Sequence, residues 1–267
     1  MQLLVVFSLI LAAVASHPSR NVLPFRDALG LAPKIISGKP AAVGQFPWQV
    51  LNNFKRFDGS FLCGGALVGS RWVLTAAHCA QDALEFKITL GSVRSDGNLE
   101  EHAQVIVTDS AFVHPNFDQF YILNDIALIN LKTEPVLSDY VKVIALGSEN
   151  LEAQIGLTVS GWGKTSDATN VASPTLNFVE LNTISNAECK LTYGPSINDG
   201  SICCVGSPEH SPCNGDSGSP LVQYKDVPYH SGVASFVHEM GCASGNPSGY
   251  ARTSYFKSWI DETISNN

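Results

Sequence analysis

One serine of this chain lies between glycines in the string Gly215-Asp216-Ser217-Gly218. Flanking glycines favour a tight turn that exposes the hydroxyl and allows close approach by another molecule, as a nucleophile requires. Most strings of this kind are only turns, so Ser217 alone is a weak signal. A nucleophilic role also requires a base within reach and a group that orients the base.

The string Ala76-Ala77-His78-Cys79 offers the base, because its histidine lies among small residues and is anchored by the adjacent cysteine. A buried carboxylate could orient that histidine. Asp125 stands directly before an apolar stretch, residues 126–131, which favours a place at the mouth of a strand. Asp118 is a rival carboxylate, but its sequence setting is typical of a surface turn.

Short apolar stretches separated by turn residues indicate the elements that would position these groups. They cover residues 48–51, 65–68, 72–75, 86–90, 104–108, 126–131, 157–160, 178–184, 220–223, 230–236 and 249–253. Many short strands of this kind predict an antiparallel barrel or sandwich. Helical spacing of apolar residues predicts a helix over 254–264, and a second, short helix is expected over 186–193.

The composition supports a folded domain and argues against nucleic-acid binding. The chain has 267 residues, of which 45% are hydrophobic and 15% are charged, so it can bury a large core. Its formal net charge of -8 opposes a general attraction to phosphate groups. We interpret the negative charge as favouring solubility.

The N-terminus is typical of a secretory signal peptide. Residues 3–14 are almost entirely apolar, and Ala13-Val14-Ala15 fits the small-x-small cleavage rule. We expect a signal peptide over 1–15, with cleavage after Ser16 as the alternative. No later apolar run reaches the ~18 residues of a membrane span. The chain is therefore expected to be secreted, where disulfides persist.

Taken together, the three motifs in the order His78, Asp125, Ser217 resemble the chymotrypsin-like serine peptidases. Further strings support this resemblance, which covers Ile35 to the C-terminus: Phe46-Pro47-Trp48-Gln49-Val50, Cys63-Gly64-Gly65, Ser160-Gly161-Trp162-Gly163 and Tyr255-Phe256 followed by Trp259-Ile260. The resemblance implies an all-β fold of two packed six-stranded antiparallel β-barrels with a C-terminal α-helix. The barrels should meet near residue 150, and arthropod chymotrypsin- or elastase-like digestive members look most similar.

The resemblance also implies the roles of the reacting groups. Ser217 would attack the scissile carbonyl, His78 would act as general base and then acid, and Asp125 would hold the imidazole. The N–H groups of Gly215 and Ser217 would form the oxyanion hole. No cofactor and no metal are expected, because the cysteines form no CxxC pair and the histidines no cluster. The calcium loop of some trypsins would match residues 91–102, which begin without suitable ligands.

Zymogen activation is a further implication. The basic residue Lys34 is followed by Ile35-Ile36-Ser37-Gly38, which looks like a processing site for a trypsin-like protease. In the family, the freed amino group of the residue at Ile35 pairs with the carboxylate at Asp216. A buried carboxylate without a cation is unfavourable, so this pairing would complete the site. We expect a pro-segment over 16–34 and a peptidase domain over 35–267.

Seven cysteines leave at least one without an intrachain partner. By resemblance, Cys63 pairs with Cys79 and Cys213 with Cys242. Cys189 pairs with Cys203 or Cys204, and spacing from Cys213 favours Cys203. The spare thiol is expected to be buried, with a dimer through it as the alternative.

The resemblance places Ser211 at the base of the S1 pocket, six residues before Ser217. The pocket walls would include Ser235, Phe236, Val237 and Ser248, and Phe236 would stand on the substrate-binding edge. Because Ser211 is neutral, a preference for Lys or Arg is not expected. We expect apolar P1 residues, with Leu, Met and Ala first and with Phe and Tyr left open.

The expected partners are protein or peptide substrates, an activating trypsin-like protease and protein protease inhibitors, with no nucleic acid and no membrane. We expect a monomer in the extracellular space, with the gut lumen as one such place. A non-catalytic homologue that acts as a binding protein is the main alternative, although such homologues usually lack a triad residue. A regulatory cascade protease would often carry a further N-terminal domain.

Overall fold

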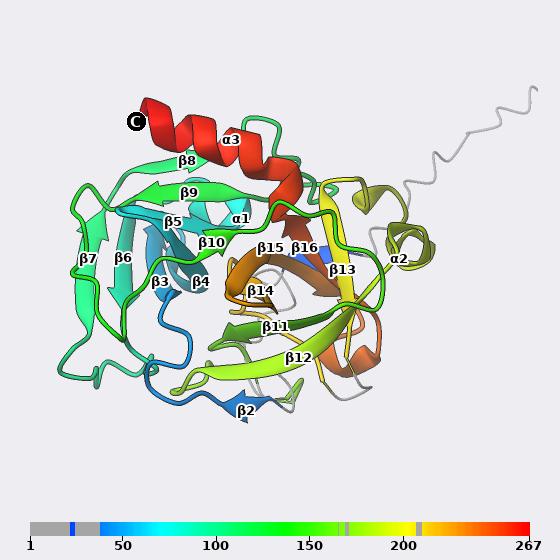
Figure 1. The fold of residues 1–267 in the computed structure, drawn as a ribbon. Coiled ribbons are helices and arrows are strands. Elements are labelled where there is room, and N and C mark those ends of the chain that lie inside the picture. Colours follow the sequence, from blue (N-terminus) through cyan, green and yellow to red (C-terminus); the bar gives the residue numbers. More distant parts are fainter. Residues whose placement is uncertain (1–21, 25–37, 165, 169–170, 207–209) are drawn as a thin grey trace, which may run out of the picture.

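The computed structural model describes the backbone of residues 22–24 and residues 38–267 without 165, 169–170 and 207–209. The predicted signal peptide and Lys34-Ile35 lie outside the described residues. Two β-sheets stand side by side, and a C-terminal helix packs along one side of the pair (Figure 1). The all-β fold with a C-terminal helix is therefore confirmed.

The N-terminal sheet contains seven antiparallel strands in the order β7-β6-β3-β4-β5-β9-β8. They are β3 (Gln49–Arg56), β4 (Gly59–Gly69), β5 (Trp72–Thr75), β6 (Glu85–Leu90), β7 (Gln104–Thr108), β8 (Ala111–Val113) and β9 (Ala127–Asn130). The two outer strands, β7 and β8, are separated only by Asp109 and Ser110. The Thr108 hydroxyl and the Asn130 N–H bridge this break, donating to Asn130 O and Ser110 O. In place of the first predicted six-stranded barrel, this half is therefore an open seven-stranded sheet, in which β7 pairs with β6 and β8 pairs with β9.

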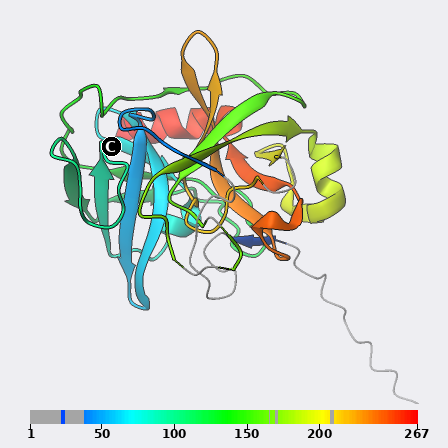
Figure 2. The ribbon, with the colours of Figure 1, turned by 90° about the horizontal axis from the view of Figure 1, so that it is seen from below.

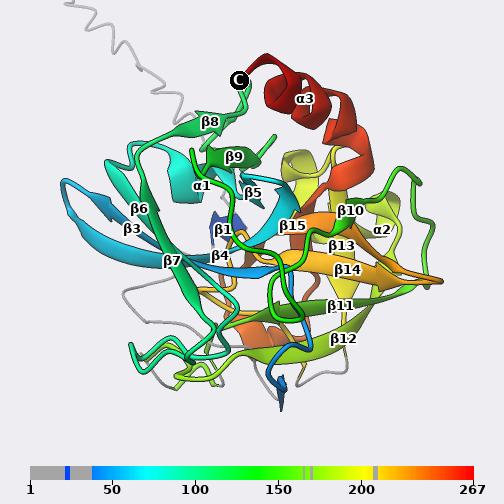
Figure 3. The same cartoon turned by 60° about the vertical axis from the view of Figure 1, so that its left-hand side comes forward.

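The C-terminal sheet contains the predicted six-stranded closed barrel. Its strands are β11 (Gly156–Gly161), β12 (Asn177–Ile184), β13 (Ser201–Val205), β14 (Pro220–Tyr224), β15 (Pro228–His238) and β16 (Ser248–Arg252). The order β15-β14-β11-β12-β13-β16 is closed by pairing of β16 with β15 (Figure 3). Three short strands join this barrel from outside: β1 (Val22–Pro24), β2 (Lys39–Pro40) and β10 (Ala145–Leu146).

Helices are few. They are α1 (Ala77–Ala80), α2 (Asn186–Tyr193), α3 (Thr253–Asn266) and the 3-10 turns η1 (Gly194–Ser196) and η2 (Cys242–Ser244). Ser185 caps α2, since its hydroxyl accepts from Glu188 N at 3.1 Å. The amphipathic pattern of α3 buries Phe256 and Ile260 against the barrels. None of the described helices is long and apolar enough to cross a membrane.

The two sheets contact each other where the serine turn meets β4. Gly64 N donates to Ser217 O at 2.7 Å. A Cβ on Gly64 would overlap the Ser219 hydroxyl, so only glycine fits this approach. The string Cys63-Gly64-Gly65 therefore has a direct physical role in joining the two halves of the site.

Every predicted strand has a counterpart, and the differences lie at the strand ends and in five strands that were not predicted. The interval 72–75 agrees with β5, whereas β4 and β15 are longer than the intervals 65–68 and 230–236. The strands β1, β2, β8, β10 and β13 were not expected. The helix predicted over 186–193 agrees with α2.

Candidate active site

Three side chains that are far apart in the sequence form a continuous hydrogen-bonded chain. His78 Nε2 lies 2.9 Å from Ser217 Oγ, and His78 Nδ1 lies 2.8 Å from Asp125 Oδ2. All three residues are buried, with at most 4% of each exposed. In this arrangement the imidazole can take a proton from the serine while the carboxylate fixes its tautomer.

Local structure fixes the histidine and the aspartate against each other. The ladder between β5 and β9 places Thr75 opposite Ala127. His78 follows β5 in the short helix α1, and Asp125 precedes β9, so both leave the same end of the paired strands. His78 N also donates to Asp125 Oδ1 at 2.9 Å, and the disulfide from Cys79 to Cys63 ties α1 to β4. The predicted setting of both residues is therefore found.

A fourth residue extends the chain. The Ser235 hydroxyl donates to Asp125 Oδ2 at 2.5 Å. Ser235 is only 1% exposed and lies in β15, in the other sheet. The sequence analysis placed Ser235 in the S1 wall and did not foresee this bond. No local sequence pattern around Ser235 indicates that its partner is Asp125, which lies 110 residues away in the sequence.

The serine turn has the backbone that its glycines allow. Gly215 and Gly218 have φ values of +89° and +78°. A Cβ on Gly218 would overlap Thr75 Oγ1 and strain the turn. The N–H groups of Gly215 and Ser217 donate to no backbone carbonyl of the described residues. Two donors next to the nucleophile suit a substrate oxygen that gains negative charge.

Asp216 is fully buried below this turn. Its carboxylate accepts from Gly163 N at 2.7 Å and from Cys213 N at 2.9 Å. Burial raises the pKa of Asp216 to about 8, because no cation among the described residues offsets the loss of water. A Cβ on Gly161 or Gly163 would overlap this carboxylate. The string Ser160-Gly161-Trp162-Gly163 thus shapes the cradle of Asp216.

The five predicted S1 residues do not share one surface. Ser211 and Ser248 line a cavity of about 10 Å³ together with Gly206, His210, Asn246 and the disulfide at Cys242. Ser248 Oγ lies 2.9 Å from Tyr250 Oη, and Ser211 Oγ donates to Pro212 O at 2.9 Å. The cavity as described is too small for a substrate side chain.

The other expected wall residues are not among those that line this cavity. Phe236 is 2% exposed, and its ring packs edge-on against Tyr193 with centroids 5.1 Å apart. The same ring covers Gly249, where a Cβ would overlap it. Val237 packs in the apolar cluster that contains Cys213 and Cys242. Phe236 and Val237 can therefore offer their backbone, rather than their side chains, to a ligand on β15.

The disulfides join Cys63 to Cys79, Cys189 to Cys203 and Cys213 to Cys242, the same pairs that the resemblance favours. Neighbouring residues of a strand point to opposite faces. In β13, Cys203 thus faces Cys189 of α2, while Cys204 packs in the apolar cluster of the barrel. Burial raises the pKa of the Cys204 thiol, which keeps it protonated.

Two groups of side chains in the described part of the chain have metal-like spacing. They are Cys63, His78 and Cys79, and Asp167, Cys213 and Cys242. In each group both cysteines are oxidised to a disulfide, so neither offers a thiolate. In the stretch compared with a calcium loop, Glu100 accepts from Ser92 Oγ at 2.5 Å.

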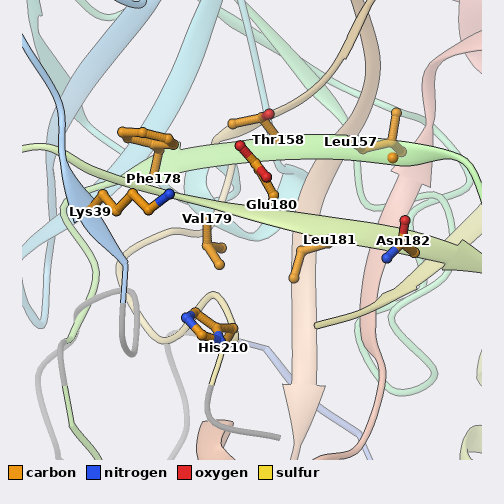
Figure 4. Close-up of a pocket in the computed structure, with 10 residues that line it drawn as sticks. Lys39, Leu157, Thr158, Phe178, Val179, Glu180, Leu181, Asn182 and His210 are labelled. Carbon is orange, nitrogen blue, oxygen red and sulfur yellow. The ribbon is translucent and has the colours of Figure 1, made fainter. Parts of the chain in front are cut away.

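A groove lies away from the triad, along β11 and β12 (Figure 4). It has a volume of about 480 Å³, and Lys39, Thr158, Glu180 and His210 are among its lining residues. None of the predicted site residues lines this groove. The candidate site is therefore identified by the hydrogen-bonded chain and not by this groove.

Comparison with known proteins agrees with this geometry. The Trypsin family model matches residues 35–260. The chain is 35% identical to brachyurin of Leptuca pugilator, covering 85% of this chain and 96% of that protein. It is 35% identical to a collagenase of Hypoderma lineatum, covering 98% of each, and 36% identical to human kallikrein-7, covering 86% and 87%.

A solved structure titled HL collagenase superposes with a TM-score of 0.78 at 34% identity, covering 86% of this chain and 98% of that one. Fold, sequence and the candidate site thus agree over most of the chain. The chain belongs to the trypsin family and is a serine peptidase.

Proposed function

We propose that the chain is a secreted endopeptidase that cleaves after apolar residues, with His78, Asp125 and Ser217 as its catalytic triad. The observation that carries this proposal is the unbroken hydrogen-bonded chain from Asp125 through His78 to Ser217. A homologue retained only for binding would have no need of all three groups at these distances.

The proposed reaction is acyl transfer to water through the serine. Ser217 Oγ attacks the carbonyl carbon while His78 Nε2 takes its proton, and Asp125 stabilises the imidazolium. The N–H groups of Gly215 and Ser217 bind the oxygen that becomes negative. Loss of one such donor typically costs about 3 kcal/mol of transition-state stabilisation. His78 then protonates the leaving amine, and a water molecule releases the acyl group.

Activation is proposed to follow cleavage between Lys34 and Ile35 by a trypsin-like protease. The raised pKa of Asp216 supports this step, because the buried carboxylate lacks a cation among the described residues. The freed ammonium of Ile35 would supply one, favour the charged carboxylate and fix the adjacent Gly215.

The proposed P1 preference follows from the neutral cavity floor. Ser211 and Ser248 both use their hydroxyls within the protein, so neither presents a charge to Lys or Arg. An uncharged floor favours apolar side chains such as Leu, Met and Ala over Lys and Arg, and the aromatic residues are the alternative that measurement must rank. Secretion into an extracellular or gut space, a monomeric state and regulation by protein inhibitors belong to the same proposal.

The test is a P1 profile of the activated enzyme. The full chain is expressed, treated with trypsin and sequenced from its N-terminus to establish that Ile35 is free. Chromogenic peptides with Phe, Leu, Ala or Arg at P1 are then compared, with Ser217→Ala as the control. We expect cleavage after apolar residues that is lost in the control. Cleavage mainly after Arg would contradict the role of Ser211, and no cleavage at all would support a non-catalytic homologue.

A further inference from the structure

The turn that carries Ser217 leads into β14 of the C-terminal barrel, whereas His78 and Asp125 extend from strands of the N-terminal sheet. Figure 2 shows these two halves beside each other, with the blue and cyan strands of the N-terminal sheet next to the barrel and its orange strands. His78 Nε2 lies 2.9 Å from Ser217 Oγ. This distance therefore depends on the contacts that hold the serine turn against the N-terminal sheet.

One such contact runs through the two peptide groups of Gly64 in β4. Gly64 N donates to Ser217 O at 2.7 Å, which fixes the backbone carbonyl of the nucleophilic residue. The carbonyl oxygen of Gly64 accepts from the hydroxyl of Thr75 at 2.8 Å. Thr75 thus holds one end of the residue whose other end holds Ser217.

The hydroxyl of Thr75 takes over where the ladder between β4 and β5 ends. The last pair of that ladder places Ala66 opposite Leu74. Gly64 lies beyond this pair, and its carbonyl accepts from the Thr75 side chain instead. Thr75 is fully buried, so water cannot readily replace this donor. The orientation of the Gly64 peptide therefore depends on the Thr75 hydroxyl.

Thr75 also has a fixed place relative to the other two triad residues. In the ladder between β5 and β9 it lies opposite Ala127, which follows Asp125 by two residues. Thr75 precedes His78 by three residues at the end of β5. Its hydroxyl therefore joins the serine turn to the pair of strands from which His78 and Asp125 extend.

The serine turn packs directly on this hydrogen bond. A Cβ at Gly218 would lie 2.2 Å from Thr75 Oγ1 and 2.6 Å from Gly64 O. Gly218, the residue after the nucleophile, thus rests against both atoms of the bond. Because buried atoms are closely packed, a shift of either atom is transmitted to the turn.

A second polar contact between the two halves is longer. Gln49 of β3 accepts from Ser160 Oγ at 2.7 Å, and its Nε2 donates to Ser219 Oγ at 3.4 Å. The latter distance exceeds the usual range of hydrogen bonds in proteins, so this contact constrains the turn less. It also reaches the turn two residues after Ser217. The link through Thr75 is both shorter and closer to the nucleophile.

We propose that Thr75 is a positioning residue for the peptidase reaction. Its hydroxyl holds the peptide of Gly64, and this peptide keeps Ser217 within reach of His78. The inference rests on the proposed function, because it assumes that the triad is catalytic. Thr75 acts through the turn and does not touch the reacting atoms, so its loss should lower kcat and leave KM nearly unchanged. A misplacement of about 1 Å is enough to lower a rate about a hundredfold.

The first experiment compares two matched variants of the activated enzyme. Thr75→Val keeps the shape of the side chain and removes the hydroxyl, and Thr108→Val makes the same change at the seam between β7 and β8. The Thr108 hydroxyl is also buried and also donates to a backbone carbonyl, Asn130 O, at 2.8 Å. We expect Thr75→Val to lower kcat about tenfold or more, with KM changed by less than about a factor of two. Thr108→Val should leave both constants unchanged. An unchanged kcat in Thr75→Val would overturn the inference.

A measurement at the serine itself separates positioning from a general loss of stability. An organophosphorus reagent that modifies Ser217 Oγ depends on the same proton transfer to His78. Its rate constant should fall in Thr75→Val by the same factor as kcat and stay unchanged in Thr108→Val. Thermal unfolding should show comparable losses of stability in both variants. A less stable Thr75→Val with an unchanged rate of modification would assign Thr75 a packing role only.

A second pair of variants decides the question if Thr75→Val does not fold. Thr75→Ser and Thr75→Ala both lack the methyl group, and they differ from each other only in the hydroxyl. We expect Thr75→Ser to keep kcat within about a factor of two and Thr75→Ala to lower it about tenfold or more. Equal kcat values for these two variants would contradict a role of the hydroxyl.

The unchanged enzyme separates this inference from the proposed function. If the unchanged enzyme cleaves the chromogenic substrate and the Thr75 variants cleave it equally well, the inference fails and the proposed function stands. If the unchanged enzyme cleaves no substrate although Ile35 is free, the proposed function fails and this inference with it.

Discussion

The two sides of the candidate site differ in how completely the described residues form them. On the side of the N-terminal sheet, His78 and Asp125 are joined by two hydrogen bonds and reach Ser217. On the side of the C-terminal barrel, Asp216 has no cation among the described residues, and the cavity beside Ser211 holds about 10 Å³. Packing of the two sheets thus brings His78, Asp125 and Ser217 together, whereas the described residues leave Asp216 without a cation.

The largest expected effect concerns the assembled side. Asp125→Asn keeps the shape of the side chain but offers Nδ1 of His78 an amide in place of a carboxylate. A wrong tautomer should lower kcat by about 10⁴-fold. Steady-state kinetics on the activated enzyme measures it, and activation at Lys34 should proceed normally. A loss of less than tenfold would show that the buried carboxylate does not set the tautomer.

The next prediction concerns Asp216, on the side of the C-terminal barrel, and the dependence of the free energy of unfolding on pH. The unfolded chain releases the Asp216 proton near the ordinary value of 3.8, whereas the folded uncleaved chain keeps it to about pH 8. The unfolded state therefore binds fewer protons between these values, and stability falls as pH rises from about 4 to 8. The full contribution is present below pH 4, and the loss reaches roughly 6 kcal/mol at most.

Urea unfolding of the Ser217→Ala chain at pH 4, 6 and 8 measures this slope. The matched control adds Asp216→Asn, which should flatten the difference between the two curves. Other groups cancel in that difference, including His230, whose burial lowers its pKa to about 3. Parallel curves for the two chains would show that Asp216 is not the titrating group.

Ser235→Ala should have a smaller effect. It removes a hydrogen bond between the two sides of the site. The hydroxyl of Ser235, in the barrel, donates to Asp125 at 2.5 Å. A hydrogen bond to a charged group typically contributes about 2 kcal/mol, so kcat/KM should fall about tenfold or somewhat more. The loss should appear in kcat rather than in KM, because Ser235 acts through Asp125 and His78. An unchanged kcat would assign Ser235 a packing role only.

The sequence predicted the side with His78 and Asp125 better than the side with Asp216 and Ser211. His78, Asp125 and Ser217 lie in short sequence strings in which small residues and glycines are recognisable. Close packing around the site requires such residues, as the approach of Gly64 to Ser219 illustrates. The barrel strands follow from apolar stretches between turns. In contrast, the bond from Ser235 to Asp125 joins residues 110 positions apart, and no local pattern encodes it.

The remaining differences have similar causes. Phe236 was expected in the S1 wall, and its ring packs against Tyr193 of α2, a contact that the sequence does not reveal. The strand β13 was not expected because Cys203 and Cys204 were interpreted only as disulfide candidates. The pairing of β1 with β15 involves three residues that have a proline among them, and short pairings of this kind depend on the whole fold.

The smallest expected effect concerns the doubled cysteines of the barrel. Cys204→Ala removes one buried sulfur from an apolar cluster and should lower the free energy of unfolding by about 1 kcal/mol. Cys203→Ala breaks the link to Cys189 and should cost about 3 kcal/mol, typical of a loop of this length. Reducing agent should abolish the difference between Cys203→Ala and the unchanged chain but not that of Cys204→Ala. Equal losses for both variants would mean that Cys203 and Cys204 can each pair with Cys189. The strand β13 would then not determine which of the two cysteines points toward α2.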